Sequence, residues 1–319
     1  MAEVRTAAAP VQPTGAAALN SNTLRRRRRI RHVRILSAYG LVLPAAGFYI
    51  FFVVRPIILS AQFSFYKWNG IGLAEWVGID NYLEVFNNPK LVGSILNAFE
   101  LIVYFSFIPV AIALLAANLI RAIATSKLAG VSRTVLFLPQ VIPLVAAGIM
   151  WSWQLSVDGL VNQFLRVIGL GSITRAWLGD FNTALPAVGV IGAWVLVGLC
   201  LVLILAGMTK IDPALYEAAR IDGAGAIREF FAITLPGVRQ EVAVCVTITV
   251  IAALASFDII YISTQGGPGD STLVPGLQIF YLAFYQREIG TASAFAIVLM
   301  ALVLVVVLPL QRILRGKES

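Results

Sequence analysis

Six long apolar segments, separated by short polar connections, dominate the hydrophobic pattern of the chain. Each is at least as long as the roughly 18 to 20 residues that an α-helix needs to cross the hydrocarbon core of a membrane. Because lipid offers backbone amides and carbonyls no hydrogen-bond partner, every span should be helical. The spans are residues 36–63, 95–120, 134–155, 185–208, 242–263 and 291–314. The pattern therefore predicts an all-α, polytopic membrane protein with six transmembrane helices.

Composition agrees with a chain that lies mostly in lipid. Of its 319 residues, 59% are hydrophobic and 13% are charged, whereas soluble domains are about 25% charged. Cys200 and Cys245 lie in apolar spans and the only histidine is His32, so there is no Cys/His cluster for a metal. We read both cysteines as packing residues, and we expect no metal site.

The charges of the connections predict the orientation in the membrane. The connection between the second and third spans carries Arg121, Lys127 and Arg133 without an acid, and the segment after residue 311 carries three bases and one acid. Lys and Arg accumulate on the cytoplasmic side, so both segments should face the cytoplasm. The first-to-second and fifth-to-sixth connections hold more acids than bases and should lie outside. Both termini are then cytoplasmic.

The N-terminal segment is polar and strongly basic. Residues 1–24 are rich in Ala, Pro, Thr, Ser and Asn, and an arginine run follows at residues 25–34. Such a run is either a patch for nucleic acid or anionic lipid, or a flank that fixes orientation; we take the second interpretation and expect no nucleic-acid partner. We divide the chain into a disordered basic cytoplasmic tail (1–34), a transmembrane domain (35–314) and a cytoplasmic C-terminal tail (315–319).

A polar segment rich in small residues lies between the fourth and fifth spans, on the predicted cytoplasmic side. Asp212 followed by Pro213 is typical of an N-cap and the first position of a helix, and Gly223 is placed to end that helix in a left-handed conformation. A second helix at 227–235 should stop before Pro236. This helix–turn–helix segment is either an ordinary amphipathic loop or a surface on which a partner docks.

The residues of this segment resemble the EAA loop of permease subunits of ABC importers. The matching residues are Glu-Ala-Ala at 217–219, Asp-Gly-Ala at 222–224 and Phe-Phe-x-Ile-Thr-Leu-Pro at 230–236. The resemblance implies that residues 210–240 form a coupling loop, which docks in a cleft of a cytoplasmic ATPase. One departure is Gln240, where the family often has a second proline. The implied coupling positions are Glu217, Ala218, Ala219, Asp222, Gly223 and Pro236.

Further landmarks extend the resemblance over residues 36–314, to the carbohydrate-uptake branch that includes maltose and glycerol-3-phosphate permeases. They are Val77–Tyr82, Leu138-Pro139, Trp151, Gly159–Asn162, Phe257-Asp258, Thr264–Pro268 and Gly290–Ala294. The resemblance implies a type I importer transmembrane domain in the bacterial cytoplasmic membrane, which moves a sugar or polyol by alternating access. It also implies a second permease subunit, expected to be a different chain, two copies of an ATPase subunit, and an external solute-binding protein.

No phosphate-binding loop accompanies these landmarks. The glycine-rich Gly266–Ser271 lacks the Gly-Lys-Ser/Thr ending of such loops and is expected to be a tight external turn. The chain should therefore be a non-catalytic subunit without a cofactor of its own, and ATP and Mg should be bound by the partner ATPase.

Polar and aromatic residues inside the spans are candidates for the substrate path. Polar groups in a membrane usually face a cavity or another helix, and sugars require hydrogen-bond partners and aromatic faces. In the predicted fifth span, Asp258, Tyr261 and Thr264 are three residues apart and would share one helix face. An interhelical hydrogen bond is the alternative explanation for each polar residue. The candidates are Gln140, Trp194, Asp258, Tyr261 and Thr264.

Two other functional classes fit the sequence less well. A secondary transporter or channel driven by an ion gradient would require a buried carboxylate or histidine relay, for which Asp258 is the only plausible member. It would also leave the coupling loop unexplained. A membrane-embedded enzyme would require a nucleophile with a base, or metal ligands, and we identify no catalytic residues.

Overall fold

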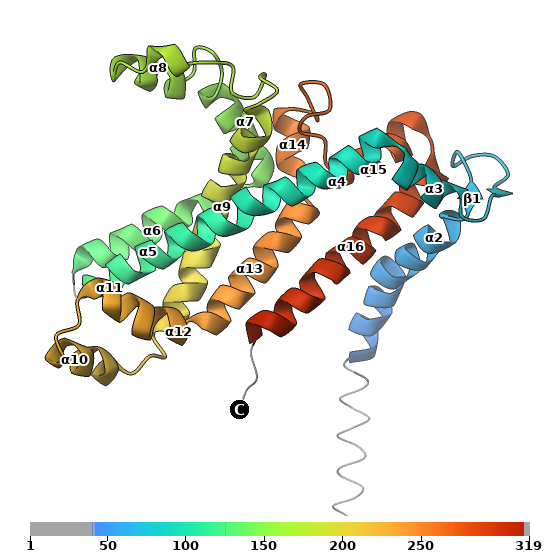
Figure 1. Ribbon diagram of the computed structural model, residues 1–319. Helices are drawn as coiled ribbons and strands as arrows, with labels where there is room; N and C mark the ends of the chain where they lie inside the picture. Colours follow the sequence, from blue (N-terminus) through green and yellow to red (C-terminus); the bar gives the residue numbers. More distant parts are fainter. Residues whose placement is uncertain (1–39, 41, 125, 316–319) are drawn as a thin grey trace, which may run out of the picture. The chain divides into compact units, whose positions relative to one another are not determined.

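The computed structural model describes residues 40, 42–124 and 126–315 (Figure 1). The predicted N-terminal tail (1–34) and residues 316–319 of the C-terminal tail lie outside the described residues. The chain divides after Leu59 into two compact units, each of which is considered by itself. A helix that includes Val42–Phe63 passes through η1 (Ile50–Val54) into α2 (Arg55–Phe63), the last four residues of which belong to the second unit. Most of its large apolar side chains, from Val42 to Ile58, are exposed.

Four helices in the described part of the chain are long and apolar enough to cross a membrane. Two further helix pairs pass the same criterion together, but they are bent by 99° and 71°. By length and composition, the described residues thus contain four candidate spans, or up to six if each bent pair is one span. The four helices are Val42–Phe63, Pro89–Ala122 (α4, Pro89–Ile102; η2, Val103–Phe107; α5, Ile108–Ala122), α9 (Ala184–Met208) and Ile289–Ile313 of α16 (Ile289–Arg315); the bent pairs are α6 (Lys127–Val141) with α7 (Leu144–Gln154), and Ala226–Gly237 with α13 (Arg239–Leu254).

The predicted third and fifth spans are not continuous helices, which corrects the expectation from the hydrophobic pattern. The third breaks at Ile142, whose backbone is extended (ψ 127°) because a residue before proline disfavours the helical region. The fifth breaks between α13 and α14 (Asp258–Ser263). There α15 (Pro275–Phe280) approaches so closely that a Cβ on Gly276 would lie 2.8 Å from the carbonyl oxygen of Ser256. The break between α13 and α14 therefore lies where Ser256 packs against Gly276, a residue distant in sequence.

Three prolines inside helices are each preceded by a wide π-helical turn. The turns η1, η2 and η4 (Phe230–Thr234) end two residues before Pro56, Pro109 and Pro236. Proline has no N–H and its ring clashes with the carbonyl four residues earlier, and a wider turn relieves both problems. The prediction that the second helix of the coupling loop ends before Pro236 is therefore wrong. That helix continues from α11 (Ala226–Glu229) through η4 and α12 (Leu235–Gly237).

Helix α9 is the centre of the second unit, as expected of a helix that is apolar on all sides. It packs against α5, α6 and α13, and its fully buried side chains include Ile191, Leu201 and Ile204. A Cβ on Gly192 would overlap the ring of Phe105. The missing side chain therefore lets α9 and η2 approach closely.

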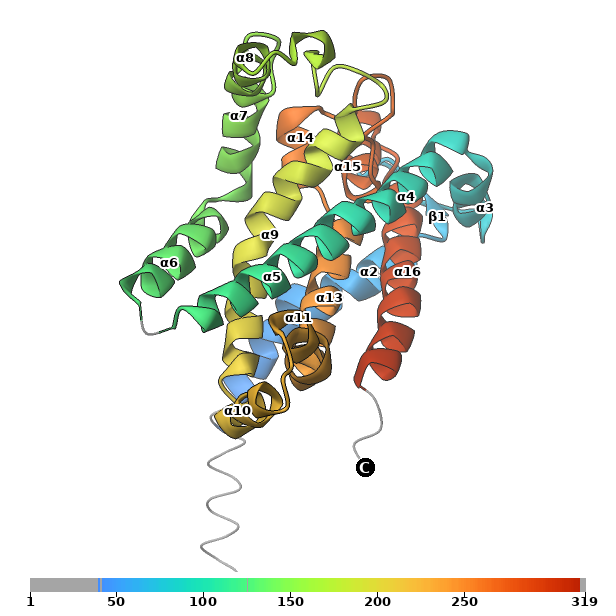
Figure 2. The ribbon, with the colours of Figure 1, turned by 60° about the vertical axis from the view of Figure 1, so that its left-hand side comes forward.

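The coupling loop and a small β-hairpin lie at opposite ends of this unit (Figures 1 and 2). The hairpin pairs β1 (Tyr66–Lys67) with β2 (Glu75–Trp76) in antiparallel fashion, and the other regular elements of the described residues are helical. It is followed by α3 (Asp80–Asn87). The amide of Asn81 donates to the carbonyls of Ser64 and Tyr66 at 2.8 and 3.0 Å, which ties α3 to the hairpin. The remaining described elements are α8 (Leu160–Val167), η3 (Gly171–Ile173), α10 (Pro213–Ile221) and η5 (Tyr281–Gln286).

Candidate functional site

The first helix of the coupling loop, α10, is fixed at both ends by residues of the loop itself. The Asp212 carboxylate accepts from the amide of Ala214 at 2.9 Å, with Pro213 at the first helical position. At the other end Gly223 has φ +78°. The amide of Ala224 donates to the carbonyl of Ala219, and that of Gly223 to Arg220, which is the Schellman pattern. These caps confirm the predicted start and end of the helix.

The surface of the coupling loop is open. Of the predicted coupling positions, Ala219 is half-buried and the other five are exposed: Glu217, Ala218, Asp222, Gly223 and Pro236. Large apolar side chains are exposed beside them, namely Leu215, Ile221, Ile227 and Phe231. A hollow of about 510 Å³ lies between α10 and η4–α12 and is lined by Asp212, Leu215 and Pro236, among others. Exposed apolar side chains gathered around small and acidic residues are typical of a protein-docking surface.

A buried ion cluster attaches α10 to the helical bundle. Glu229, at the end of α11, is 5% exposed. Its two carboxylate oxygens accept from Arg220 at 3.1 Å and from Arg121 at 3.4 Å. The Arg121 guanidinium also lies 3.8 Å from the ring centre of Tyr216, and the Tyr216 hydroxyl is 3.0 Å from that of Thr234. This cluster could not be predicted from the sequence, because nothing local relates Arg121 to a residue 108 positions later.

The three predicted path residues of the fifth span do not share one uninterrupted helix face. Asp258 is exposed at the first position of α14, and Tyr261 stacks on Phe257 with ring centres 5.2 Å apart. Thr264 lies just beyond the helix end at Ser263, and its hydroxyl is 2.7 Å from that of Thr272. Thr264 thus stabilises the turn after α14, whereas Asp258 and Tyr261 remain available to a ligand.

Trp194 comes from α9, which contacts α14, and Gln140 comes from α6, which packs against α9. Trp194 meets Trp151 of α7 edge-on at 5.5 Å, and Trp151 and Tyr261 pack against the same core cluster. Gln140 lies against Gly198, one turn along α9 from Trp194. Among the described residues, Gln140 Oε1 and Trp151 Nε1 are buried without a hydrogen-bond partner. Polar atoms of this kind require a partner such as water or a ligand hydroxyl.

A continuous set of aromatic rings adjoins Tyr261. Phe280 of α15 contacts Phe257 and Tyr261 with ring centres 5.4 and 5.5 Å apart, and Tyr285 of η5 at 5.7 Å. Tyr285 is exposed, so the rings lead from the surface to the side of α14. The sequence analysis missed Phe280 and Tyr285, which lie in a connection between predicted spans; their aromatic spacing was the only available signal.

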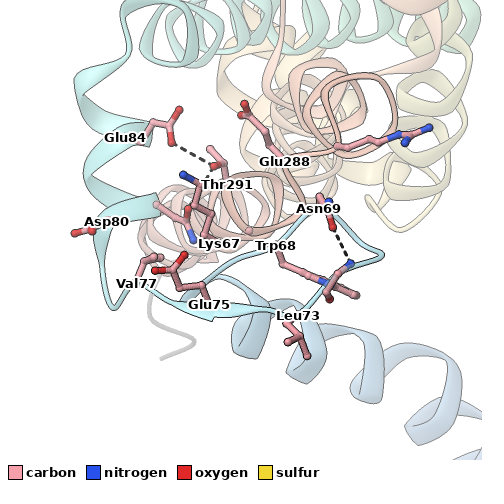
Figure 3. A pocket seen from close by; sticks show the side chains of 14 residues that line it. Lys67, Trp68, Asn69, Leu73, Glu75, Val77, Asp80, Glu84, Glu288 and Thr291 are labelled. Atoms are coloured by element: carbon pink, nitrogen blue, oxygen red, sulfur yellow. Dashed lines mark hydrogen bonds between the residues drawn. The ribbon is translucent and has the colours of Figure 1, made fainter.

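A second hollow, of about 680 Å³, lies at the hairpin end, where the hairpin meets α3 and the start of α16 (Figure 3). Glu84 accepts from the Thr291 hydroxyl at 3.3 Å. Glu288 is exposed, but partial desolvation in the hollow raises the pKa of its carboxyl. The nearby Glu84 charge raises this pKa further, and Lys67 opposes both effects. The hollow is therefore a polar pocket with an excess of carboxylates, which the sequence analysis did not identify.

Comparison with known families decides what kind of protein carries these features. The family model of the inner membrane component of binding-protein-dependent transport systems matches residues 110–317, more than half of the chain. The chain belongs to this family. The matched region contains the coupling loop, the candidate path and all of α9, α13 and α16.

Individual relatives agree with the family assignment of this permease. It is 33% identical over 288 residues to the probable ABC transporter permease protein YurN of Bacillus subtilis (strain 168), covering 88% of this chain and 97% of the relative. It is 32% identical over 293 residues to the diacetylchitobiose uptake system permease protein NgcF of Streptomyces coelicolor, covering 88% and 82%. A chain in the crystal structure of a bacterial ABC transporter involved in alginate import has the same fold, with a TM-score of 0.79 at 24% identity, covering 92% of this chain and 100% of that one.

Two of the sequence landmarks of this permease have structural roles in the connections between helices. The amide of the buried Asn162 donates to the carbonyls of Ser156, Val157 and Arg175, and its oxygen accepts from Trp177 at 2.8 Å. The landmark Thr264–Pro268 leads into the predicted turn at Gly266–Ser271, where Gly266 has φ +91° and the amide of Thr272 donates to the carbonyl of Gly266. These hydrogen bonds hold the connections between helices in place.

Proposed function

We propose that this permease is the membrane-spanning subunit of an ATP-driven importer for a sugar or related polyol. The observation that carries the proposal is the coupling loop, a rigidly capped helix whose exposed face combines acids, small residues and apolar side chains. Soluble loops rarely expose such a surface without a partner. On this proposal α10 docks in a cleft of a separate ATPase, which binds ATP and Mg.

The coupling positions would make different kinds of contact with the ATPase. Ala218, Ala219 and Gly223 keep the surface shallow, so that a partner backbone can come close. Glu217 and Asp222 would form charge-assisted hydrogen bonds with Arg or Lys of the ATPase, and the exposed Ile221 would supply apolar contact. Pro236, which lines the hollow beside α10, would contact a side chain inserted there.

The proposed topology and assembly follow from this docking. The chain would cross the cytoplasmic membrane six times, with each bent pair as one span and both termini in the cytoplasm. The hairpin end would then face outward, where an external solute-binding protein delivers the cargo. A second permease subunit, expected to be a different chain, would complete the path, and two ATPase copies would drive it. Closure of the ATPase dimer would open the path outward, and release would open it inward.

The cargo follows from the chemistry of the candidate path. Asp258 and the unpartnered Gln140 Oε1 and Trp151 Nε1 can hydrogen-bond to hydroxyls, while Tyr261 and Trp194 offer rings on which a sugar face can stack. A relative of similar length is named for the uptake of the disaccharide diacetylchitobiose. Thr264 would contribute indirectly, by fixing the turn that ends α14.

Two glycines of the coupling loop allow a matched test. Gly223 has φ +78°, which proline cannot adopt, whereas Gly225 has φ −77°, close to the value that proline imposes. We expect Gly223→Pro to reduce the amount of ATPase that co-purifies with the permease by more than about tenfold, because a misfitted proline costs about 3 kcal/mol. Gly225→Pro should retain the ATPase.

The measurement uses the permease expressed with the other products of its operon and purified in mild detergent. Both variants must reach the membrane in wild-type amount. If the Gly223→Pro variant retained the ATPase, or if the wild-type chain transported cargo with no ATPase present, the proposal would be wrong. The second result would favour a secondary transporter driven by an ion gradient.

A further inference from the structure

Five side chains connect α10 with the end of α5, and we call them the clamp. Arg121 comes from the last turn of α5, Tyr216 and Arg220 from α10, Glu229 from α11 and Thr234 from η4. The clamp therefore connects a helix of the bundle with both arms of the coupling loop. Neither the coupling positions nor the candidate path includes any of these residues.

Glu229 is the centre of the clamp. It is 5% exposed, and a separate arginine donates to each of its carboxylate oxygens. Removing one member of a buried ion group leaves the remaining charge without compensation. Arg121 and Arg220 are therefore held near each other despite their like charges, and this brings the C-terminal half of α10 to the end of α5.

The aromatic part of the clamp fixes the other half of α10. The Arg121 guanidinium lies 3.8 Å from the ring centre of Tyr216, well within the range of a cation–π interaction. The Tyr216 hydroxyl bonds to the buried Thr234. Since Tyr216 and Arg220 are one helical turn apart, Arg121 and Glu229 hold α10 at two points and prevent it from rotating about its axis.

We propose that the clamp makes α10 move as one body with the cytoplasmic end of the helix Pro89–Ala122, and that Glu229 is its positioning residue. The inference rests on the proposed docking of α10 to an ATPase. A displacement of α10 would then act directly on Arg121, at the end of a helix that runs through the bundle. Without the clamp, α10 would pivot on the turns around Asp212 and Gly223 and leave α5 unmoved.

Hydrogen–deuterium exchange in the assembled transporter tests this connection. In the wild-type complex, addition of ATP and Mg²⁺ should change amide exchange both in α10 and in the last two turns of α5. In Glu229→Gln and Arg121→Met, the change in α5 should disappear while the response of α10 persists. Amides of α10 should also exchange about tenfold faster without nucleotide, in keeping with the loss of a charged hydrogen bond. Arg133→Met, which removes an exposed cation from α6, is the matched control and should behave as the wild type.

Two variants of Tyr216, one mild and one severe, provide a second test that does not depend on the folding of the Glu229 variant. Tyr216→Phe keeps the ring beneath Arg121 and should retain most of the α5 response, whereas Tyr216→Leu should lose most of it. An unchanged α5 response in Glu229→Gln, Arg121→Met and Tyr216→Leu would overturn the inference. Faster exchange spread evenly over α9, α13 and α16 would also overturn it, since the clamp would then act only in folding.

The outcomes separate the clamp from the proposed function. If the wild-type permease bound no ATPase, the proposed function would fail. The exchange rate of α10 in the permease alone would still decide whether the clamp holds that helix. If the wild-type complex formed and α10 responded to ATP while α5 did not, the docking would stand and the clamp inference would fail.

Discussion

The coupling loop and the hairpin end of the bundle both hold carboxylates near helix ends, but they arrange the surrounding charges differently. In the coupling loop, Glu229 is buried and has one arginine for each oxygen. At the hairpin end, Glu84 and Glu288 lie at one hollow, and Lys67 opposes the rise in the Glu288 pKa. Paired charges fix a position, whereas crowded carboxylates leave a pocket that favours cations and protons.

The two ends also differ in how their short helices are defined. Both ends of α10 are fixed by neighbours in sequence, with Asp212 at the start and Gly223 after the end. No side chain caps the start of α14. It is held by distant segments, because Gly276 approaches the Ser256 carbonyl and Gly148 leaves room for Ile262. Local signals thus define the coupling helix, and tertiary packing defines the break between α13 and α14.

The largest change in stability should come from Gly276→Ala, at the break between α13 and α14. The new Cβ would lie 2.8 Å from the backbone oxygen of Ser256, which cannot rotate away as a side chain could. We expect the free energy of unfolding to fall by about 1–3 kcal/mol, measured by denaturant titration in detergent. Gly223→Ala is the comparison variant: its Cβ meets nothing within 4 Å, so only the left-handed backbone costs about 1–2 kcal/mol. A Gly276→Ala protein as stable as the wild type would contradict the packing explanation.

An intermediate effect should come from the local signal at the start of α10. Asp212→Ala removes the side-chain acceptor of the Ala214 amide, and loss of an N-cap costs about 1 kcal/mol. Amides in the first turn of α10 should exchange about fivefold faster, while those of α14 should not change. Asp212→Asn retains an acceptor and should remain close to the wild type. Equal protection in the Ala and Asn variants would show that tertiary contacts, not the cap, hold this end.

The same distinction explains what could be predicted from the sequence. The start of α10 at Pro213, the left-handed Gly223 and the extent of α9 depend on residues close in sequence or on apolar length, and these predictions are confirmed. The break between α13 and α14 depends on Gly276, about twenty residues later, so no local pattern indicated it. The position of Pro236 inside a helix depends on a π-helical turn, which the sequence alone did not reveal.

The residues of the candidate site fall into the same two groups, those defined by a local motif and those defined by contacts between distant segments. The coupling positions could be named because they form one short motif. The clamp and the aromatic rings join residues from different helices, such as Arg121 with Glu229 and Tyr261 with Phe280. Hydrophobic periodicity says which face of a helix is buried but not which residue of another helix lies opposite. Their roles in coupling and transport remain predictions.

The smallest effect should appear at the carboxylates of the hairpin end, as a difference in pH dependence. Partial desolvation and the Glu84 charge raise the pKa of Glu288 above its ordinary value of 4.5. The stability that protonated Glu288 contributes is therefore present below pH 4.5 and is lost as the pH rises through the raised pKa. Glu288→Gln cannot ionise at this position, so the variant does not lose this stability as the pH rises. Its melting temperature should exceed that of the wild type by about a degree near neutral pH, and the difference should vanish in acid.

Lys67→Met sharpens this prediction, because Lys67 lowers the pKa of Glu288. Without that cation the pKa of Glu288 should rise further. The loss of stability should still begin near pH 4.5, but it should continue to a higher pH and reach a larger amount. Combining Lys67→Met with Glu288→Gln should abolish the additional pH dependence, since the titrating group is gone. If Lys67→Met left the pH profile of the melting temperature unchanged, the carboxylates would not be crowded as the pocket geometry indicates. The contrast with the fully paired Glu229 would then lose its electrostatic basis.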